Sequence, residues 1–128
     1  MNIATPPVKI SYKQYTFTIN STTIIDKKFE LPSEAKKVTG IRLDSPDETL
    51  LATRGSCRIE LSNRELFPEE FPARFLQFGR EVPASERMHE LNEVLTAFNL
   101  KIRFQDQPAP SSPALVPYSV TIIVRYEV

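Results

Sequence analysis

Apolar and polar residues alternate along most of this chain with the two-residue period of half-buried strands. The clearest case is SCRIELS (56–62), where one face carries Cys57, Ile59 and Leu61 and the other is polar. The segment YSVTIIVRYEV (118–128) repeats the pattern, with one face formed by Val120, Ile122, Val124 and Tyr126. Alternate side chains of a strand point to one side, so these positions predict inward-facing core residues. Cys57 is then a small buried hydrophobe.

Six further segments have a strand-like composition: residues 8–19, 24–31, 36–44, 65–67, 73–78 and 101–105. Gly40 disturbs the alternation of the third segment, which predicts a β-bulge or a close backbone approach there. Asn63-Arg64 is expected to form a tight turn before residues 65–67. Pro68 follows that short segment and has no N–H for a sheet ladder, so we expect the strand to stop there.

The segment SERMHELNEVLTAFN (85–99) has a different pattern. Its apolar residues fall at helical spacing, at Met88, Leu91, Val94 or Leu95, and Phe98. Ser85 is suited to an N-cap and Asn99 to the C-terminal end, so the pattern favours one short helix over 85–98. A pair of strands is the alternative, because Val94-Leu95 is also strand-like.

Eleven prolines against three glycines divide the chain into short pieces, which suits short strands and rigid loops. The prediction is an all-β fold: a two-sheet antiparallel β-sandwich, jelly-roll-like, with at most one short helix. An immunoglobulin-type sandwich is the rival, but the chain has no Trp and no Cys pair. Residues 1–128 form one domain of ordinary size, with 1–7 as an extended N-terminal arm containing Pro6 and Pro7.

Charge and hydropathy narrow the function classes. The 16 basic and 16 acidic residues cancel, so the surplus of cations that non-specific nucleic-acid binding requires is missing. No N-terminal stretch has the layout of a signal peptide, and no apolar run approaches the ~20 residues of a membrane span. A soluble protein with no membrane span is expected, cytoplasmic unless it is part of a virion.

No catalytic or metal-binding set is visible in the sequence. His89 is the lone histidine and Cys57 the lone cysteine, so a nucleophilic device would have to use His89 and a zinc site would lack ligands. Asp44, Asp47 and Glu48 offer oxygen ligands, but their spacing is not that of an EF-hand loop. We therefore expect no enzyme activity, no metal and no cofactor.

Two adjacent carboxylates, Glu69 and Glu70, lie between two Phe-Pro pairs. Glycoside hydrolysis needs two carboxyls facing each other across a substrate, and adjacent residues usually point in different directions. We interpret Glu69 and Glu70 as the solvated tip of a loop between Pro68 and Pro72.

Four phenylalanines, at 67, 71, 75 and 78, fall within a short stretch of the chain. Either they hold the stretch on the sandwich core, or some of them form an assembly patch. The candidate assembly interface, including the arm, comprises Phe67, Pro68, Phe71, Pro72, Phe75, Pro6 and Pro7.

The run RGSCRIELSNRELFPEEFPARFLQFG, followed by VPASERMHEL and a final PYSVTIIVRYEV, resembles small single-jelly-roll structural proteins of viruses, bacteriophage included. The resemblance extends over most of the chain as a pattern and carries over no functional residue. It implies a virion component, such as a capsid, vertex or decoration protein, that forms a symmetric homo-oligomer and contacts other structural proteins. The alternative is a non-catalytic carbohydrate-binding or adhesion module, with candidate stacking residues Tyr12, Tyr15, Tyr118 and Tyr126.

Overall fold

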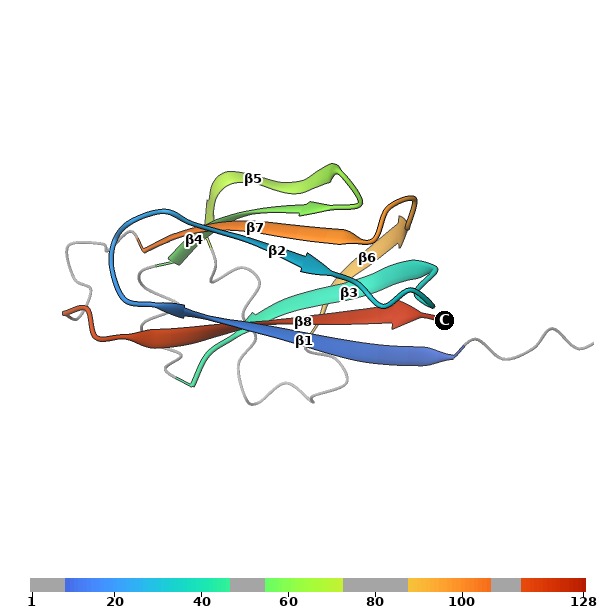
Figure 1. Cartoon of the computed structure of the whole chain (residues 1–128), viewed down its shortest axis with the longest axis horizontal. Helices are drawn as coiled ribbons and strands as arrows, with labels where there is room; N and C mark the ends of the chain where they lie inside the picture. The colour runs from blue at the N-terminus through green and yellow to red at the C-terminus, as the bar shows by residue number, and fades with distance from the viewer. Residues whose placement is uncertain (1–8, 47–54, 73–87, 107–113) are drawn as a thin grey trace, which may run out of the picture.

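The computed structural model describes residues 9–46, 55–72, 88–106 and 114–128, with the side chains of 68–72 left out. The described residues form eight strands and no helix. The strands are β1 (Ile10–Ile19), β2 (Ile25–Glu30), β3 (Lys37–Asp44), β4 (Gly55–Leu61), β5 (Arg64–Pro72), β6 (His89–Val94), β7 (Asn99–Asp106) and β8 (Tyr118–Glu127). They build two antiparallel sheets of four, so the predicted two-sheet β-sandwich is confirmed (Figure 1).

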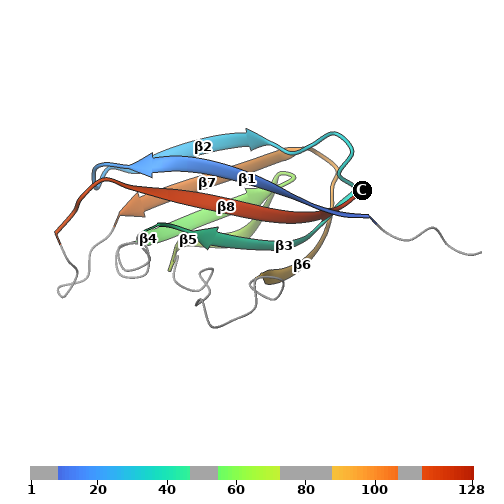
Figure 2. The same ribbon diagram turned by 90° about the horizontal axis from the view of Figure 1, so that it is seen from below.

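The order of the strands is β1-β8-β3-β6 in one sheet and β2-β7-β4-β5 in the other. Each of the first four strands therefore pairs with its counterpart from the last four in reverse order: β1 with β8, β2 with β7, β3 with β6 and β4 with β5. This is the arrangement of a long hairpin that has been rolled up into two layers, the jelly roll. Figure 2 shows the two layers from below.

The connections divide between the two ends of the sandwich. One end, which we name the turn end, holds the connections of residues 31–36, 62–63 and 95–98. The opposite end, the far end, is where β1, β3, β5 and β7 finish and where β2, β4, β6 and β8 start. β1 starts and β8 finishes at the turn end, where the Val128 N–H donates to the Lys9 carbonyl at 2.9 Å.

The β4–β5 hairpin closes through a two-residue turn. Ser62 and Asn63 both have positive φ, 53° and 63°, as a type I′ turn requires. The Ser62 hydroxyl accepts hydrogen bonds from the Thr96 and Ala97 N–H groups at 2.9 and 2.8 Å. The hairpin turn is thus tied to the β6–β7 connection, which fixes the turn end.

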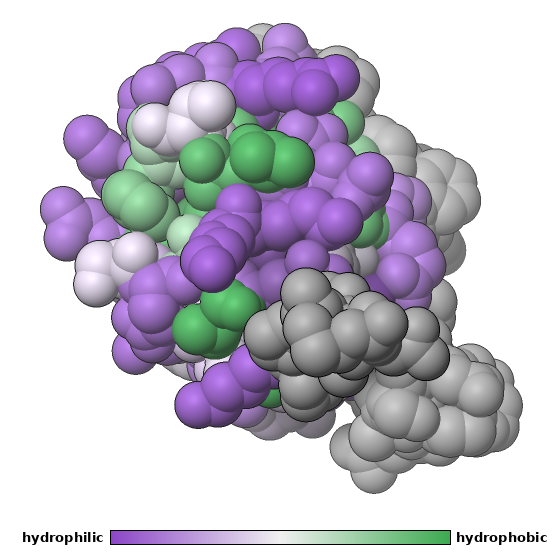
Figure 3. Space-filling model, turned by 90° about the vertical axis from the view of Figure 1, so that its right-hand side faces the viewer, coloured by the Kyte–Doolittle hydropathy of each residue, from purple (hydrophilic) through white to green (hydrophobic). Residues whose placement is uncertain are grey.

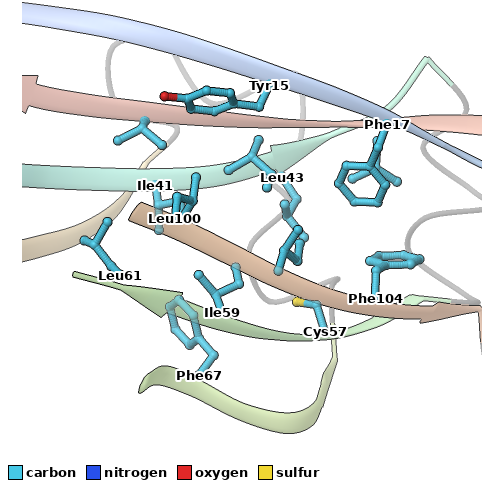
Figure 4. Packing of buried hydrophobic residues seen from close by; sticks show 14 of the residues in the cluster. Tyr15, Phe17, Ile41, Leu43, Cys57, Ile59, Leu61, Phe67, Leu100 and Phe104 are labelled. Carbon is cyan, nitrogen blue, oxygen red and sulfur yellow. The ribbon is translucent and has the colours of Figure 1, made fainter. Parts of the chain in front are cut away.

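The core lies between the sheets and takes side chains from both (Figure 4). Ile41 and Leu43 of β3 face Cys57 and Ile59 of β4, and all four are almost fully buried. Phe17 of β1 meets Phe104 of β7 edge-to-face, with ring centroids 5.7 Å apart. The inward positions expected of β4 and β8 are confirmed, because the alternation of apolar and polar residues identifies the buried face of each strand.

The helix favoured over 85–98 is wrong. Residues 89–94 form strand β6, which pairs with β3 in the register Lys37↔Val94 and Ile41↔His89, and β7 begins at Asn99. In so short a segment, apolar residues spaced three or four apart do not distinguish a helix from a strand. Pairing with β3 determines that this segment is a strand. The strand alternative left open by the sequence is correct for 89–94, although β6 and β7 lie in different sheets and do not pair with each other.

The expected stop at Pro68 is also wrong. β5 continues through Pro68 to Pro72. It is the edge strand of its sheet, where a missing N–H on the unpaired side removes no ladder hydrogen bond. The β4–β5 register shifts between Cys57 and Ile59, as an irregular edge strand allows. Glu69 and Glu70 accordingly lie within a strand and not at a loop tip. The segment 73–78 lies outside the described residues.

Candidate functional site

The four tyrosines lie in described strands, and they divide sharply in exposure. Tyr15, Tyr118 and Tyr126 are buried. The Tyr15 hydroxyl donates to the Glu30 carbonyl at 2.6 Å, and burial raises its pKa to about 12, with the neighbouring Tyr126 adding to the shift. Tyr12, by contrast, leaves 55% of its surface exposed. Of the tyrosine candidates for a stacking surface, the structure therefore retains Tyr12.

Tyr12 belongs to the outward face of β1 and β8. We call this surface the neutral face and define it by Tyr12, Gln14, Thr16 and Thr18 of β1 with Ser119 and Thr121 of β8. The β1 members are exposed, and none of the six carries a charge. Thr16 and Thr121 are directly opposite, with their Oγ1 atoms 2.9 Å apart. An exposed ring thus adjoins a row of amide and hydroxyl groups.

The cation nearest in register to Tyr12 is turned away from it. Arg125 is opposite Tyr12 on one side and Gly40 on the other. Its guanidinium reaches toward β3 and β6, where it donates to the Thr39 carbonyl at 2.8 Å and forms an ion pair with Glu90. Tyr12 is left open to solvent as a result.

Gly40 provides the space for this arrangement. A Cβ at position 40 would lie 3.1 Å from Arg125 Nη2 and 3.1 Å from Met88 Cβ. The register shift between Val38 and Gly40 confirms the predicted bulge. The sequence indicated a bulge or close approach at Gly40, but not that the approaching group is a guanidinium from β8.

The outward face of the other sheet is charged; we call it the ion-pair face. Arg58 of β4 bonds Glu60 at 2.8 Å and Glu65 at 3.5 Å, and Arg103 of β7 bonds Asp26 at 2.9 Å. Glu60 and Glu65 are directly opposite across β4 and β5, a repulsive pair that Arg58 offsets by contacting both. These pairs join two arginines with three carboxylates and are partly open to solvent.

Cys57 and His89, the two residues that a nucleophilic site would need, both pack against other parts of the fold. Cys57 is 1% exposed, and desolvation raises the pKa of its thiol from 9.0 to about 12. The thiol keeps its proton at neutral pH and is not poised to attack. The His89 ring packs edge-on against Phe67, with centroids 5.1 Å apart.

For metal binding, the described part of the chain brings together no group of three or more His, Cys, Asp or Glu side chains. Asp44 Oδ1 accepts a hydrogen bond from the Ser45 N–H at 3.0 Å, as in turn chemistry. Asp47 and Glu48 lie outside the described residues, so Asp44 is the one member of the predicted oxygen-ligand set that the structure describes.

Phe67, the first residue of the candidate assembly interface, lies in the core. Its ring is buried opposite Ile59, so for this residue the core alternative holds and the ring supplies no exposed surface (Figure 4). Pro68, Phe71 and Pro72 are in β5, but their side chains are outside the described set, and Phe75, Pro6 and Pro7 lie outside the described residues.

Exposed apolar side chains are found elsewhere. At the turn end, Ile10, Val94 and Phe98 leave 45, 69 and 44% of their surfaces exposed. The helix favoured over 85–98 obscured the exposure of Val94 and Phe98 in the sequence. Figure 3 looks onto this end and shows hydrophobic patches set among hydrophilic residues. Ile24 and Val116 are the corresponding exposed residues at the far end among those described.

No protein-family model matches the chain, and the curated proteins and the solved structures contain no significant match to it. Within the described residues, no helix has the length and apolar character to cross a membrane.

Proposed function

We propose that this chain is a structural assembly protein, a virion component of the capsid, vertex or decoration kind that acts through homo-oligomeric interfaces. The observation that carries the proposal is the jelly-roll pairing of β1 with β8 through β4 with β5. Viral capsid proteins are a major user of this fold, beside lectin domains and cupins. The link from fold to function is an analogy, so it needs support from the surface.

The turn end provides that support. Its connections are short and tied to one another, through Ser62 to Thr96 and through the Leu31 N–H to the Phe98 carbonyl at 2.8 Å. The exposed side chains of Ile10, Val94 and Phe98 are therefore presented on a rigid surface. Apolar and aromatic groups on rigid elements are what a repeated protein–protein contact requires.

Analytical ultracentrifugation over a wide concentration range tests the proposal. We expect a closed oligomer that dissociates on dilution, because most soluble homo-oligomers have closed point-group symmetry. A species that stays monomeric at the highest concentrations would overturn the proposal.

A matched pair of variants locates the contact. Phe98→Asp at the turn end should shift the sedimentation profile toward monomer, since it places a charge in the apolar contact. Ile24→Asp at the far end is the control, because Ile24 is 48% exposed against 44% for Phe98. Equal behaviour of the two variants would contradict a contact at the turn end.

A further inference from the structure

The neutral face has the chemistry of a carbohydrate platform. We infer that it binds a neutral oligosaccharide, with a sugar ring stacked on Tyr12 and its hydroxyls bonded by the polar residues that follow along β1. This function is additional to assembly and does not depend on it.

The stacking group is the phenol ring of Tyr12. No aromatic contact with another described ring involves it, and 55% of its surface is open. The C–H face of a pyranose is apolar, whereas its rim is hydroxylated, so it suits an exposed ring whose far edge is polar. A sheet position also limits the motion of the ring and lowers the entropy lost on binding.

Hydrogen-bonding groups extend from that ring in a line. Gln14 and Thr16 are on the same face of β1 as Tyr12 and are exposed. Tyr12 and Thr16 are four residues apart on one strand, about 13 Å, which matches a short oligosaccharide. The amide and hydroxyl groups both donate and accept, as sugar hydroxyls do.

Charge decides what kind of glycan fits. The charged side chains of β8 nearest this region pair toward β3 and β6: Arg125 with Glu90, and Glu127 with Lys37 at 3.8 Å. Lys13 alternates onto the opposite side of β1 from Tyr12. Among the described residues, the remaining cation on this side of the sheet, Arg42, belongs to β3 and is separated from β1 by β8. An acidic glycan lying along β1 would therefore lose water without gaining a cation on that strand, so the ligand is neutral.

The same face is poorly suited to a second copy of the chain. The apolar residue beside this face is Ile123 of β8, opposite Gln14, and it is already buried within the subunit. What remains exposed beyond Tyr12 is amide and hydroxyl groups, whereas a protein contact needs an apolar centre.

The test is a glycan array that carries neutral, sialylated and sulfated oligosaccharides, probed with the full chain and followed by titration calorimetry on the best neutral glycan. We expect binding to neutral glycans that persists at high salt. Tyr12→Ala should raise Kd at least about tenfold, and Tyr12→Phe should retain most of the affinity. Ile24→Ala, which removes an exposed apolar side chain at the far end and outside the proposed oligomer contact, is the control and should change Kd less than about twofold.

Three results would overturn the inference. The first is an array with no neutral glycan bound, and the second is binding confined to acidic glycans and lost on adding salt. The third is a Tyr12→Ala protein that binds the glycan as tightly as the parent does. A Tyr12→Ala protein whose sedimentation changes while its glycan binding does not would assign the face to a contact with a second copy. Circular dichroism of each variant separates loss of binding from loss of fold.

Discussion

The two sheets contribute similarly to the core and differ on the outside. Inward, each supplies fully buried aliphatic residues, such as Ile41 from β3 and Ile59 from β4. Outward, β2-β7-β4-β5 carries the ion pairs of Arg58 and Arg103, whereas the outward residues of β1 in the other sheet carry no charge. The fold constrains the inner faces through packing, and it leaves each outer face free to acquire its own chemistry.

The largest expected effect tests the equivalence of the inner faces. Ile41→Ala and Ile59→Ala remove the same atoms from opposite sheets at positions with 0% exposure. Each should lower the free energy of unfolding by about 2–5 kcal/mol, the cost of lost burial plus a cavity. Urea denaturation measures both, and a value under about 1 kcal/mol for either one would show that its sheet is not part of a common core.

The next effect concerns Cys57 on the inner face of β4. Its pKa is 9.0 ordinarily and about 12 in the fold, so between these values the unfolded chain loses a proton that the folded chain keeps. Stability should therefore be constant with respect to this thiol below pH 9 and fall as the pH rises from 9 toward 12.

The comparison that isolates the thiol is Cys57→Ala. Tyr15 titrates in the same range, because its pKa is also raised, from 10.0 to about 12. Unfolding curves of the parent and variant at several alkaline pH values should differ in slope. Parallel pH profiles would show that Cys57 is accessible to water in the folded state.

On the outer side of the β1-β8-β3-β6 sheet, the sharpest expectation concerns Gly40. Gly40→Ala places a Cβ 3.1 Å from Arg125 Nη2 and Met88 Cβ, and Met88 Cβ cannot yield by rotating a side chain. Overpacking of this kind costs about 1–3 kcal/mol. A melting temperature equal to that of the parent would mean that β3 and β6 separate easily at this point.

The smallest effect distinguishes the outer faces directly. Arg58→Ala breaks two half-exposed ion pairs on the ion-pair face and should cost no more than about 1 kcal/mol, with the loss shrinking at high salt. Thr16→Ala on the neutral face should show no such dependence on salt. Matching salt profiles for the two variants would remove the electrostatic distinction between the faces.

Much of the fold was accessible from the alternation of residues. The strand around Cys57, Ile59 and Leu61 and the final strand were predicted with their inward faces. In a half-buried strand, the alternation of apolar and polar residues shows which face is buried. Gly40 likewise indicated a bulge. The pairing order could not be predicted, since it depends on contacts between distant strands that no local pattern encodes.

The failures share a physical cause. A helix was favoured for residues 89–94 because their strand identity comes from pairing with β3. The strand at 65–67 was expected to stop at Pro68 because the tolerance of that proline depends on an edge position. The neutral face was missed in part for the same reason. Tyr12 was a candidate among four tyrosines, and its exposure is set by Arg125 and Gly40, residues remote in sequence.

The rolled-hairpin pairing also has a consequence for how the protein is made. Ile10 pairs with Glu127, and β8 is an inner strand of its sheet, between β1 and β3. On the ribosome, the first half of the chain cannot complete that sheet until β8 has been synthesised. Until then, the edges of β1 and β3 that pair with β8 have no hydrogen-bonding partner. Loop closure over such separations is slow, and we expect nascent and truncated chains to depend on chaperones more than the finished fold does.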